Sequence, residues 1–186
     1  KNGTEPVIRF FDFLISFFGL FFLSPLIIIL FIIGIFENGS PLFKQQRIGY
    51  HQKFFTLVKF RTMRKETKSV ATHLVNNSLI TPFGYFLRRT KLDEILQLFN
   101  VLIGDMSLVG PRPSLPNQKK LISERKKRGL FNVKPGITGL AQMSSINMKT
   151  PTLLAKTDFK MISNMNLYNY FYYILKTLLL IFKKRV

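Results

Sequence analysis

Apolar residues are concentrated at the two ends of this 186-residue chain. Residues 13–35 carry no charge, and this run exceeds the ~20 residues that a membrane-spanning helix needs. Ser24-Pro25 lies near its middle, where proline removes a backbone donor and bends a helix. Basic residues flank the run on both sides, whereas a spanning helix usually has one basic flank. Two structures stay open: a spanning helix, or a re-entrant helix–break–helix hinged at Ser24-Pro25.

The C-terminal segment, residues 167–186, is amphipathic. Its tyrosines suit the level of lipid headgroups, and its basic residues can reach anionic lipid. We therefore expect an in-plane interfacial helix, with a core helix of the folded body as the alternative. The residues concerned are Tyr168, Tyr170, Tyr172, Tyr173, Lys176 and Lys183-Lys184-Arg185.

The middle of the chain predicts helices with one small β-hairpin. Residues 42–45 and 54–60 flank turn-forming residues at 49–52, a pattern typical of a hairpin. Residues 61–80 are polar and weakly periodic, which indicates a loop. Thr81-Pro82 predicts the start of a short helix that runs to about Arg89. The fold class is thus mostly α with a small hairpin (α+β), without a classical nucleotide-binding sheet.

Asp93 and Glu94 form an adjacent carboxylate pair in a chain that is poor in acids. The chain has 9 acidic and 28 basic residues, a formal net charge of +19 and no cysteine. Thr90 is expected to cap a helix whose first turn holds both acids, where the macrodipole favours negative charge. One carboxylate can attack an electrophile while its neighbour holds a metal. The alternative is a capping box with a surface charge. The apolar stripe of this helix would be Leu92, Ile95, Leu96, Phe99 and Leu102.

Two stiff turns and a basic helix follow the acid pair. The turn at 110–113 carries one guanidinium, Arg112, between two prolines, and arginine can bind phosphate through two hydrogen bonds. Residues 134–139 form a second, glycine-containing turn, and 115–127 predict a basic helix. Such turns also occur as plain surface loops. The high positive charge indicates anionic partners such as phosphates, phospholipid or nucleic acid, with a solvated basic surface as the alternative.

Taken in order, these motifs resemble the monotopic bacterial phosphoglycosyl transferases, the bacterial sugar transferase family of the PglC type. The resemblance covers roughly residues 7–182. The matching stretches are Phe11-Asp12, Ser24-Pro25, Lys59-Phe60-Arg61-Thr62-Met63, Leu92-Asp93-Glu94 with Gln97-Leu98-Phe99-Asn100, Gly104-Asp105-Met106-Ser107-Leu108-Val109-Gly110-Pro111-Arg112-Pro113, and Lys134-Pro135-Gly136-Ile137-Thr138-Gly139.

The resemblance implies a reaction and roles for individual residues. A sugar-1-phosphate would pass from a UDP-sugar to a polyprenyl phosphate such as undecaprenyl phosphate, with release of UMP, as the first step of glycoconjugate assembly. Asp93 would be the nucleophile of a ping-pong mechanism through an aspartyl phosphosugar. Glu94 would bind Mg²⁺, and Lys59, Arg88 and Arg112 would surround the phosphates.

The resemblance also implies where the chain works and how it is divided. It places a monotopic, re-entrant protein at the cytoplasmic face of the bacterial inner membrane. Residues 7–38 would be the membrane helix, 39–166 the catalytic domain and 167–186 the interfacial helix. Residues 1–6 are expected to be a vector-derived extension because the sequence starts at Lys1 without methionine. Membrane lipid would be a partner and nucleic acid would not, and a homo-oligomer is left open.

Two of the chain's departures from the family pattern lie after the second turn. Where relatives continue after the second turn with W/L-A-Q-V-N-G-R, Ser145 replaces the glycine and Ile146 the arginine. The D-x-x-Y-x-x-N pattern appears as Asp158, Met161 and Asn164, without its aromatic residue. A different hypothesis is a non-catalytic basic module that binds anionic lipid or nucleic acid at the membrane surface.

Overall fold

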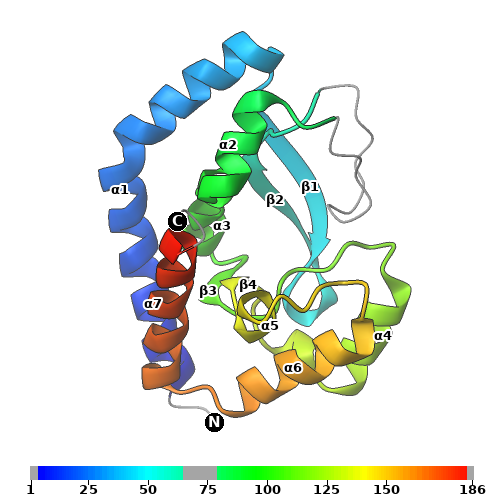
Figure 1. Ribbon diagram of the computed structural model, residues 1–186. Coiled ribbons are helices and arrows are strands. Elements are labelled where there is room, and N and C mark those ends of the chain that lie inside the picture. The colour runs from blue at the N-terminus through cyan, green and yellow to red at the C-terminus, as the bar shows by residue number, and fades with distance from the viewer. Residues whose placement is uncertain (1–3, 65–78, 184–186) are drawn as a thin grey trace.

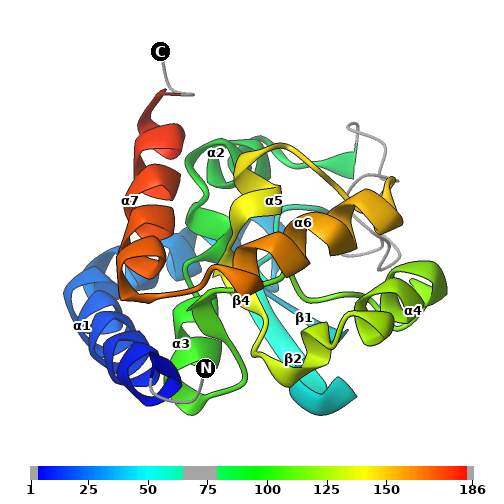
Figure 2. The ribbon, with the colours of Figure 1, turned by 90° about the horizontal axis from the view of Figure 1, so that it is seen from below.

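The computed structural model describes residues 4–64 and 79–183. The two ends of this chain, α1 (Thr4–Asn38) and α7 (Leu167–Lys183), lie side by side along one edge of the molecule (Figures 1 and 2). The remaining elements pack beside them as one body. Of the predicted loop at 61–80, residues 65–78 lie outside the described part.

Helix α1 bends but does not break. It is continuous from Thr4 to Asn38 with Pro25 inside it, and Figure 1 shows it changing direction partway along. Pro25 has no N–H to donate to the carbonyl of Phe21, and the Ser24 hydroxyl donates to that carbonyl instead, at 2.7 Å. This substitute bond keeps the helix intact, which corrects the expectation of two helices separated by a break. Among the described helices, α1 alone is long and apolar enough to cross a membrane.

The expected hairpin is present. Strands β1 (Leu42–Ile48) and β2 (Phe54–Phe60) pair antiparallel, and a short 3₁₀ turn, η1 (Tyr50–Gln52), lies in the connection. The alternation of inward and outward positions along β1 puts Gln45 and Arg47 among the buried residues.

A second, parallel sheet was not expected. Strand β3 (Ser107–Val109) directly precedes the turn expected at 110–113, and β4 (Gly136–Thr138) lies within the turn expected at 134–139. The two strands pair in parallel. Gly110 and Gly136 allow this pairing, because a Cβ on Gly136 would collide with the backbone of Gly110. Within the described residues both named sheets have two strands, so neither is a classical nucleotide-binding sheet.

Some helices begin or end where the sequence predicted, and others do not. Helix α2 (Pro82–Thr90) begins as predicted, since the Thr81 hydroxyl accepts from the N–H of Gly84 at 2.9 Å. Thr90 is not a cap, because it is the last residue of α2. The other helices and 3₁₀ turns are η4 (Leu92–Glu94), α3 (Gln97–Ile103), α4 (Lys119–Lys127), η5 (Leu130–Asn132), α5 (Leu140–Met143) and α6 (Pro151–Ser163). The basic helix therefore starts four residues later than expected.

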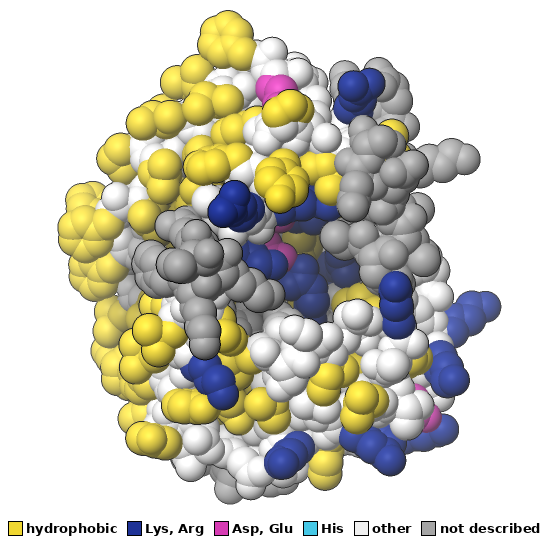
Figure 3. Space-filling view, viewed as in Figure 1, with side chains coloured by type: hydrophobic (Ala, Val, Ile, Leu, Met, Phe, Trp, Pro, Cys, Tyr) yellow, Lys and Arg dark blue, Asp and Glu magenta, His cyan; other side chains and the backbone are white. Residues whose placement is uncertain are grey.

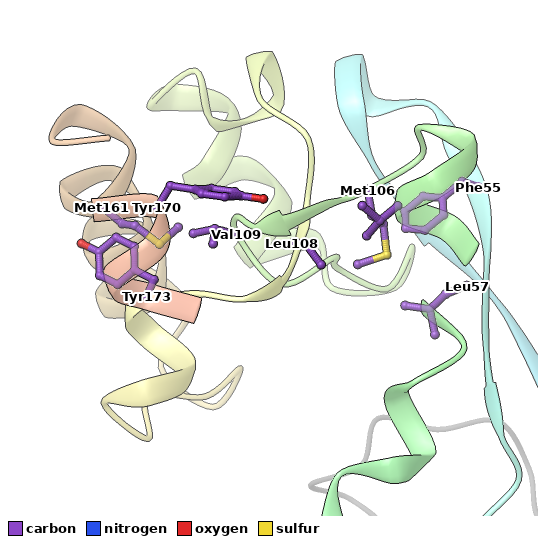
Figure 4. Close-up of a cluster of buried hydrophobic side chains, with 9 residues drawn as sticks. Phe55, Leu57, Met106, Leu108, Val109, Met161, Tyr170 and Tyr173 are labelled. Atoms are coloured by element: carbon purple, nitrogen blue, oxygen red, sulfur yellow. The ribbon is translucent and has the colours of Figure 1, made fainter. Parts of the chain in front are cut away.

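The largest apolar cluster connects α7 to the strands (Figure 4). Tyr170 and Tyr173 of α7 are buried together with Leu108 and Val109 of β3 and Met161 of α6. This corrects the expectation that all four tyrosines lie at headgroup level. Exposed α7 side chains, namely Tyr168, Tyr172, Leu175, Leu178 and Leu179, form a separate apolar face. The helix is thus amphipathic, with one face docked on the core.

Candidate active site

The acid pair lies in a 3₁₀ turn between two helices. Lys91 ends α2 in the left-handed conformation (φ 61°) and turns the chain into η4, which contains Asp93 and Glu94. Leu92 packs against a buried cluster that includes Phe60 and Leu87. Burial of Leu92 draws the turn into the body, so the acids lie in a 3₁₀ turn and not in the first turn of an α-helix as predicted. Of the predicted stripe, Phe99 is exposed.

Asp93 is buried without a full set of hydrogen bonds. Its residue is 6% exposed, and its Oδ1 atom has no hydrogen-bond partner. Burial raises the pKa of Asp93 to about 6, and Glu94 acts in the same direction, while Lys59, Lys91 and Arg112 oppose them. Unpaired buried carboxylate oxygens are rare in folded proteins. Oδ1 of Asp93 is therefore an unused hydrogen-bond acceptor next to Glu94.

Glu94 is held differently, by a direct ion pair. Its Oε1 lies 2.6 Å from Nη2 of Arg112, which comes from the Pro-Arg-Pro turn. Burial acts to raise the pKa of Glu94, but the charge and hydrogen bond of Arg112 outweigh it, and the pKa is lowered. Glu94 is thus ionised at neutral pH, next to an acid with a raised pKa.

Further cations surround the pair. Lys59 of β2 interacts electrostatically with both acids, and burial lowers its pKa to about 8. Arg88 of α2 interacts with Asp93, and its Nε donates to the Thr62 hydroxyl at 2.9 Å. Figure 3 shows a hollow on this face, with Lys and Arg side chains around an acidic group. A cationic hollow of this kind favours anionic ligands such as phosphates.

The structure brings the five predicted site residues together, and it adds one that was missed. Arg47 of β1 is buried and interacts electrostatically with Arg112 and Glu94, and burial lowers its pKa to about 10. In the sequence, Arg47 was only one of the basic residues that follow the N-terminal apolar run. The available signal was its place on the same strand face as Gln45, which is the inward face of the hairpin. Ser24 and Pro25 lie in α1 and shape that helix.

The acid pair can bind a divalent cation only if phosphate and water supply most of the ligands. Within residues 4–64 and 79–183, no three His, Cys, Asp or Glu side chains cluster. Asp93 offers its unpaired Oδ1, and Glu94 offers the oxygen that Arg112 does not contact. Mg²⁺ suits such a set, because it commonly uses one or two carboxylates and takes its other ligands from phosphates and water. The residues present therefore fit Mg²⁺ together with a phosphate substrate.

Comparison with known sequences gives the family. The profile of the family described as bacterial sugar transferase matches residues 4–184, which is nearly the whole chain. The match begins at residue 4, where α1 begins, and so includes part of the stretch assigned to a vector-derived extension.

Proteins with similar sequences carry related names. The chain is 37% identical over 164 residues to an undecaprenyl-phosphate galactose phosphotransferase of Salmonella typhimurium, covering 79% of this chain and 34% of that protein. It is 48% identical over 124 residues to an uncharacterized sugar transferase, EpsL, of Bacillus subtilis, covering 65% and 61%. An exopolysaccharide production protein, PSS, of Rhizobium leguminosarum is 38% identical over 153 residues, covering 76% of each. The chain thus spans 34% of the length of the Salmonella protein and 61% of that of EpsL. On the profile match and the acid pair in its cationic hollow, this chain belongs to the bacterial sugar transferase family.

Proposed function

We propose that this protein is a phosphoglycosyl transferase that moves a sugar-1-phosphate from a UDP-sugar to polyprenyl phosphate and releases UMP. The observation that carries the proposal is the buried, unpaired Oδ1 of Asp93 inside a ring of cations. A carboxylate in such a ring is well placed to attack phosphorus, since the cations offset the charge of phosphate groups. The names of relatives support the donor and acceptor classes, for example "UDP-glucose:undecaprenyl-phosphate glucose-1-phosphate transferase" of Klebsiella pneumoniae.

The first half-reaction uses Asp93 as the nucleophile. An ionised oxygen of Asp93 forms a bond to the phosphorus that carries the sugar. The bond from that phosphorus to the oxygen bridging to UMP breaks, and UMP leaves with the electron pair. Arg112, Lys59 and Arg88 surround the phosphates and offset the negative charge that develops on the departing UMP.

The second half-reaction regenerates the carboxylate. A phosphate oxygen of the polyprenyl phosphate attacks the same phosphorus, and the bond to Asp93 breaks. The product is a polyprenyl diphosphate sugar, and Asp93 leaves as a carboxylate. Splitting one transfer into two displacements at a single carboxylate is ping-pong catalysis.

Mg²⁺ is proposed as the cofactor, held by Glu94. When bound, it would supply positive charge to the diphosphate and orient it. Arg112 then has a second purpose, because its ion pair with Glu94 at 2.6 Å holds that carboxylate ionised and in one orientation.

We place α1 in one leaflet as a re-entrant helix, with the site at the cytoplasmic face of the inner membrane. Both ends of α1 are attached to the same body. Near its start, Arg9 donates to the carbonyls of Val101 and Leu102 at 2.5 and 2.9 Å. Near its end, Glu37 accepts from the N–H of Phe83 at 3.1 Å. A helix that crossed the bilayer would have its ends on opposite sides, so these two attachments support the re-entrant form.

UMP release tests this function. Protein in detergent would be given a panel of UDP-sugars and undecaprenyl phosphate, with Mg²⁺ or with a chelator. We expect turnover with at least one donor, no turnover in chelator, and a loss of at least about 1,000-fold in Asp93→Asn. Protein quenched with donor alone should gain the mass of one sugar phosphate on Asp93. Glu124→Gln, a change in an acid on the surface of α4, is the control and should turn over normally.

Three outcomes would contradict the proposal. Full turnover by Asp93→Asn would remove the nucleophile, and an adduct on another residue would relocate it. Tight, salt-sensitive RNA binding without any UMP release would instead favour the basic binding module.

A further inference from the structure

The Pro-Arg-Pro turn that carries Arg112 is held by its backbone at three successive positions. The carbonyl of Pro111 accepts from the N–H of Gly136 at 3.0 Å. The carbonyl of Arg112 accepts from Nη1 of Arg125 at 2.7 Å, and that of Pro113 from Nη1 of Arg47 at 3.0 Å. The buried guanidinium groups of Arg125 and Arg47 therefore hold the backbone at Arg112 and at the residue after it.

Arg125 is itself held by a buried ion pair between two helices. Its Nη2 lies 2.6 Å from Oδ2 of Asp158 on α6, and its Nε donates to the same oxygen at 3.2 Å. The side chains are 3% and 1% exposed. One guanidinium thus joins α6 to the backbone of Arg112, with no freedom to turn toward solvent.

Stability alone is a weak reason for such a pair. Removing two charges from water costs several kcal/mol per ion, and well-packed apolar replacements of buried pairs are often neutral or stabilising. The third hydrogen bond of Arg125, which goes to the Arg112 carbonyl, points to another purpose. Arg112 is also the residue that contacts Glu94 at 2.6 Å.

We propose that the Arg125–Asp158 pair positions Arg112 for the reaction, by fixing its backbone so that its guanidinium stays against Glu94 beside Asp93. Arg125 and Asp158 are positioning residues, because their hydrogen bonds go to each other and to the Arg112 carbonyl and not to Asp93 or Glu94. Because prolines on both sides already restrict the turn, the hydrogen bonds to its carbonyls set its location on the body. This inference rests on the proposed function, in which Arg112 offsets charge on the phosphates.

The test separates positioning from stability through a double substitution. Arg125→Met with Asp158→Leu replaces the pair by apolar side chains, so the unfolding midpoint should stay close to that of the wild type. We expect kcat for UMP release to fall about 100-fold, the scale of a small misplacement of a catalytic group. KM should change less, because an interaction that matters most in the transition state is lost. A purely structural pair would leave kcat unchanged.

A conservative variant and a matched control keep the test decisive if the double variant folds poorly. Arg125→Lys retains a cation beside Asp158 but cannot span Asp158 and the Arg112 carbonyl as a guanidinium does. It should lower kcat while the fold is maintained. Arg128→Met is the control, since Arg128 pairs with Glu124 at 2.8 Å on the same helix. Its kcat should equal that of the wild type.

Hydrogen–deuterium exchange supplies a readout that does not depend on catalysis. Exchange in residues 107–118 should be faster in the double variant and in Arg125→Lys, but not in Arg128→Met. Wild-type protein that releases no UMP would overturn the proposed function, and exchange would still decide whether the pair holds this segment. Wild-type kcat in a folded double variant, or unchanged exchange, would overturn the positioning role.

Discussion

At the scale of single residues, burial moves the pKa values of Asp93 and Lys59 toward each other. Removal from water disfavours the charged form of any group, so it raises the pKa of the acid to about 6 and lowers that of the amine to about 8. Both groups are therefore charged together only over a narrow range of pH. The proposed mechanism needs both charges, one to attack and one to bind phosphate.

We predict a bell-shaped dependence of kcat/KM on pH. Below about 6 Asp93 gains a proton and loses its nucleophilic oxygen, so the rate falls toward acid. Above about 8 Lys59 loses its proton and its charge, so the rate also falls toward base. UMP release measured from pH 5 to pH 9 in buffers of constant ionic strength checks both limbs.

Lys59→Arg separates the two limbs. Arginine keeps its charge far above pH 8, so the alkaline limb should move up or disappear while the acid limb stays. An alkaline limb that is the same in Lys59→Arg and in the wild type would exclude Lys59 as its cause.

Sequence reasoning identified residues of this site unevenly, for a physical reason. Asp93 and Glu94 stood out because acids are scarce, and Arg112 because two prolines flank it. Arg47 did not stand out, since its role depends on which strand face is buried. The raised pKa of Asp93 could not be predicted either, because it comes from burial and not from the local sequence.

At the scale of elements, the end of α5 shows the conformational cost of one departure from the family pattern, the serine at position 145. The N–H of Ile146 donates to the carbonyl of Ala141 at 2.9 Å, and that of Ser145 to Gln142 at 3.3 Å. This pair of bonds is a Schellman motif, which requires a left-handed residue at the position of Ser145. Ser145 does adopt this conformation, with φ 57°. The glycine in the family pattern at this position therefore has a conformational reason, and the serine here is strained.

We predict that Ser145→Gly stabilises the protein. Relief of the left-handed conformation should raise the free energy of unfolding by about 1 kcal/mol, since only glycine adopts it without steric cost. Thermal or denaturant unfolding of the detergent-solubilised protein measures the change.

The neighbouring serine is a matched control. Ser144 is also exposed but has φ −87°, so Ser144→Gly adds freedom to the unfolded chain and relieves no strain. It should be neutral or destabilising. Equal effects of the two substitutions would rule out the strain at Ser145.

Elements with strong local signals were predicted, and short elements were not. The hairpin and the start of α2 follow from alternation and from a Thr-Pro cap. Strands β3 and β4 each have three residues, too few for a pattern of alternation. They form because Gly110 and Gly136 let two backbones approach, and this depends on segments far apart in the sequence.

At the scale of the whole molecule, two features determine how the protein contacts a membrane: its exposed apolar side chains and the hydrogen bonds that hold α1 on the core. Large apolar side chains along α1 are exposed, and they continue onto α2 and α7. Asp12 attaches α1 to the core, since its Oδ1 accepts from the N–H of Leu108 and the hydroxyl of Tyr170, both at 2.9 Å. The exposed apolar side chains of three elements thus belong to one body.

We predict that both ends of α1 lie on the same side of the membrane. The chain has no cysteine, so single cysteines at Thr4 and Ser40 can report this directly. In inverted inner-membrane vesicles, a membrane-impermeant maleimide should label both positions. Phe22→Cys, at an exposed apolar position near the bend, should stay unlabelled because lipid covers it.

Labelling of only one end in vesicles, with the other end labelled in intact spheroplasts, would establish a spanning helix. The re-entrant form would then be wrong, whatever the catalytic result.

The sequence by itself determined the two apolar ends, the hairpin, the start of α2, the scarce acid pair and the family. These features depend on neighbours along the chain or on motif order, and both can be read without a structure. Only the tertiary structure decided that Ser24 bonds the carbonyl that Pro25 leaves free, that Arg112 forms an ion pair with Glu94, and that Arg47 joins the site. Burial and charge contacts arise between segments distant in sequence, and here they set the chemistry of Asp93.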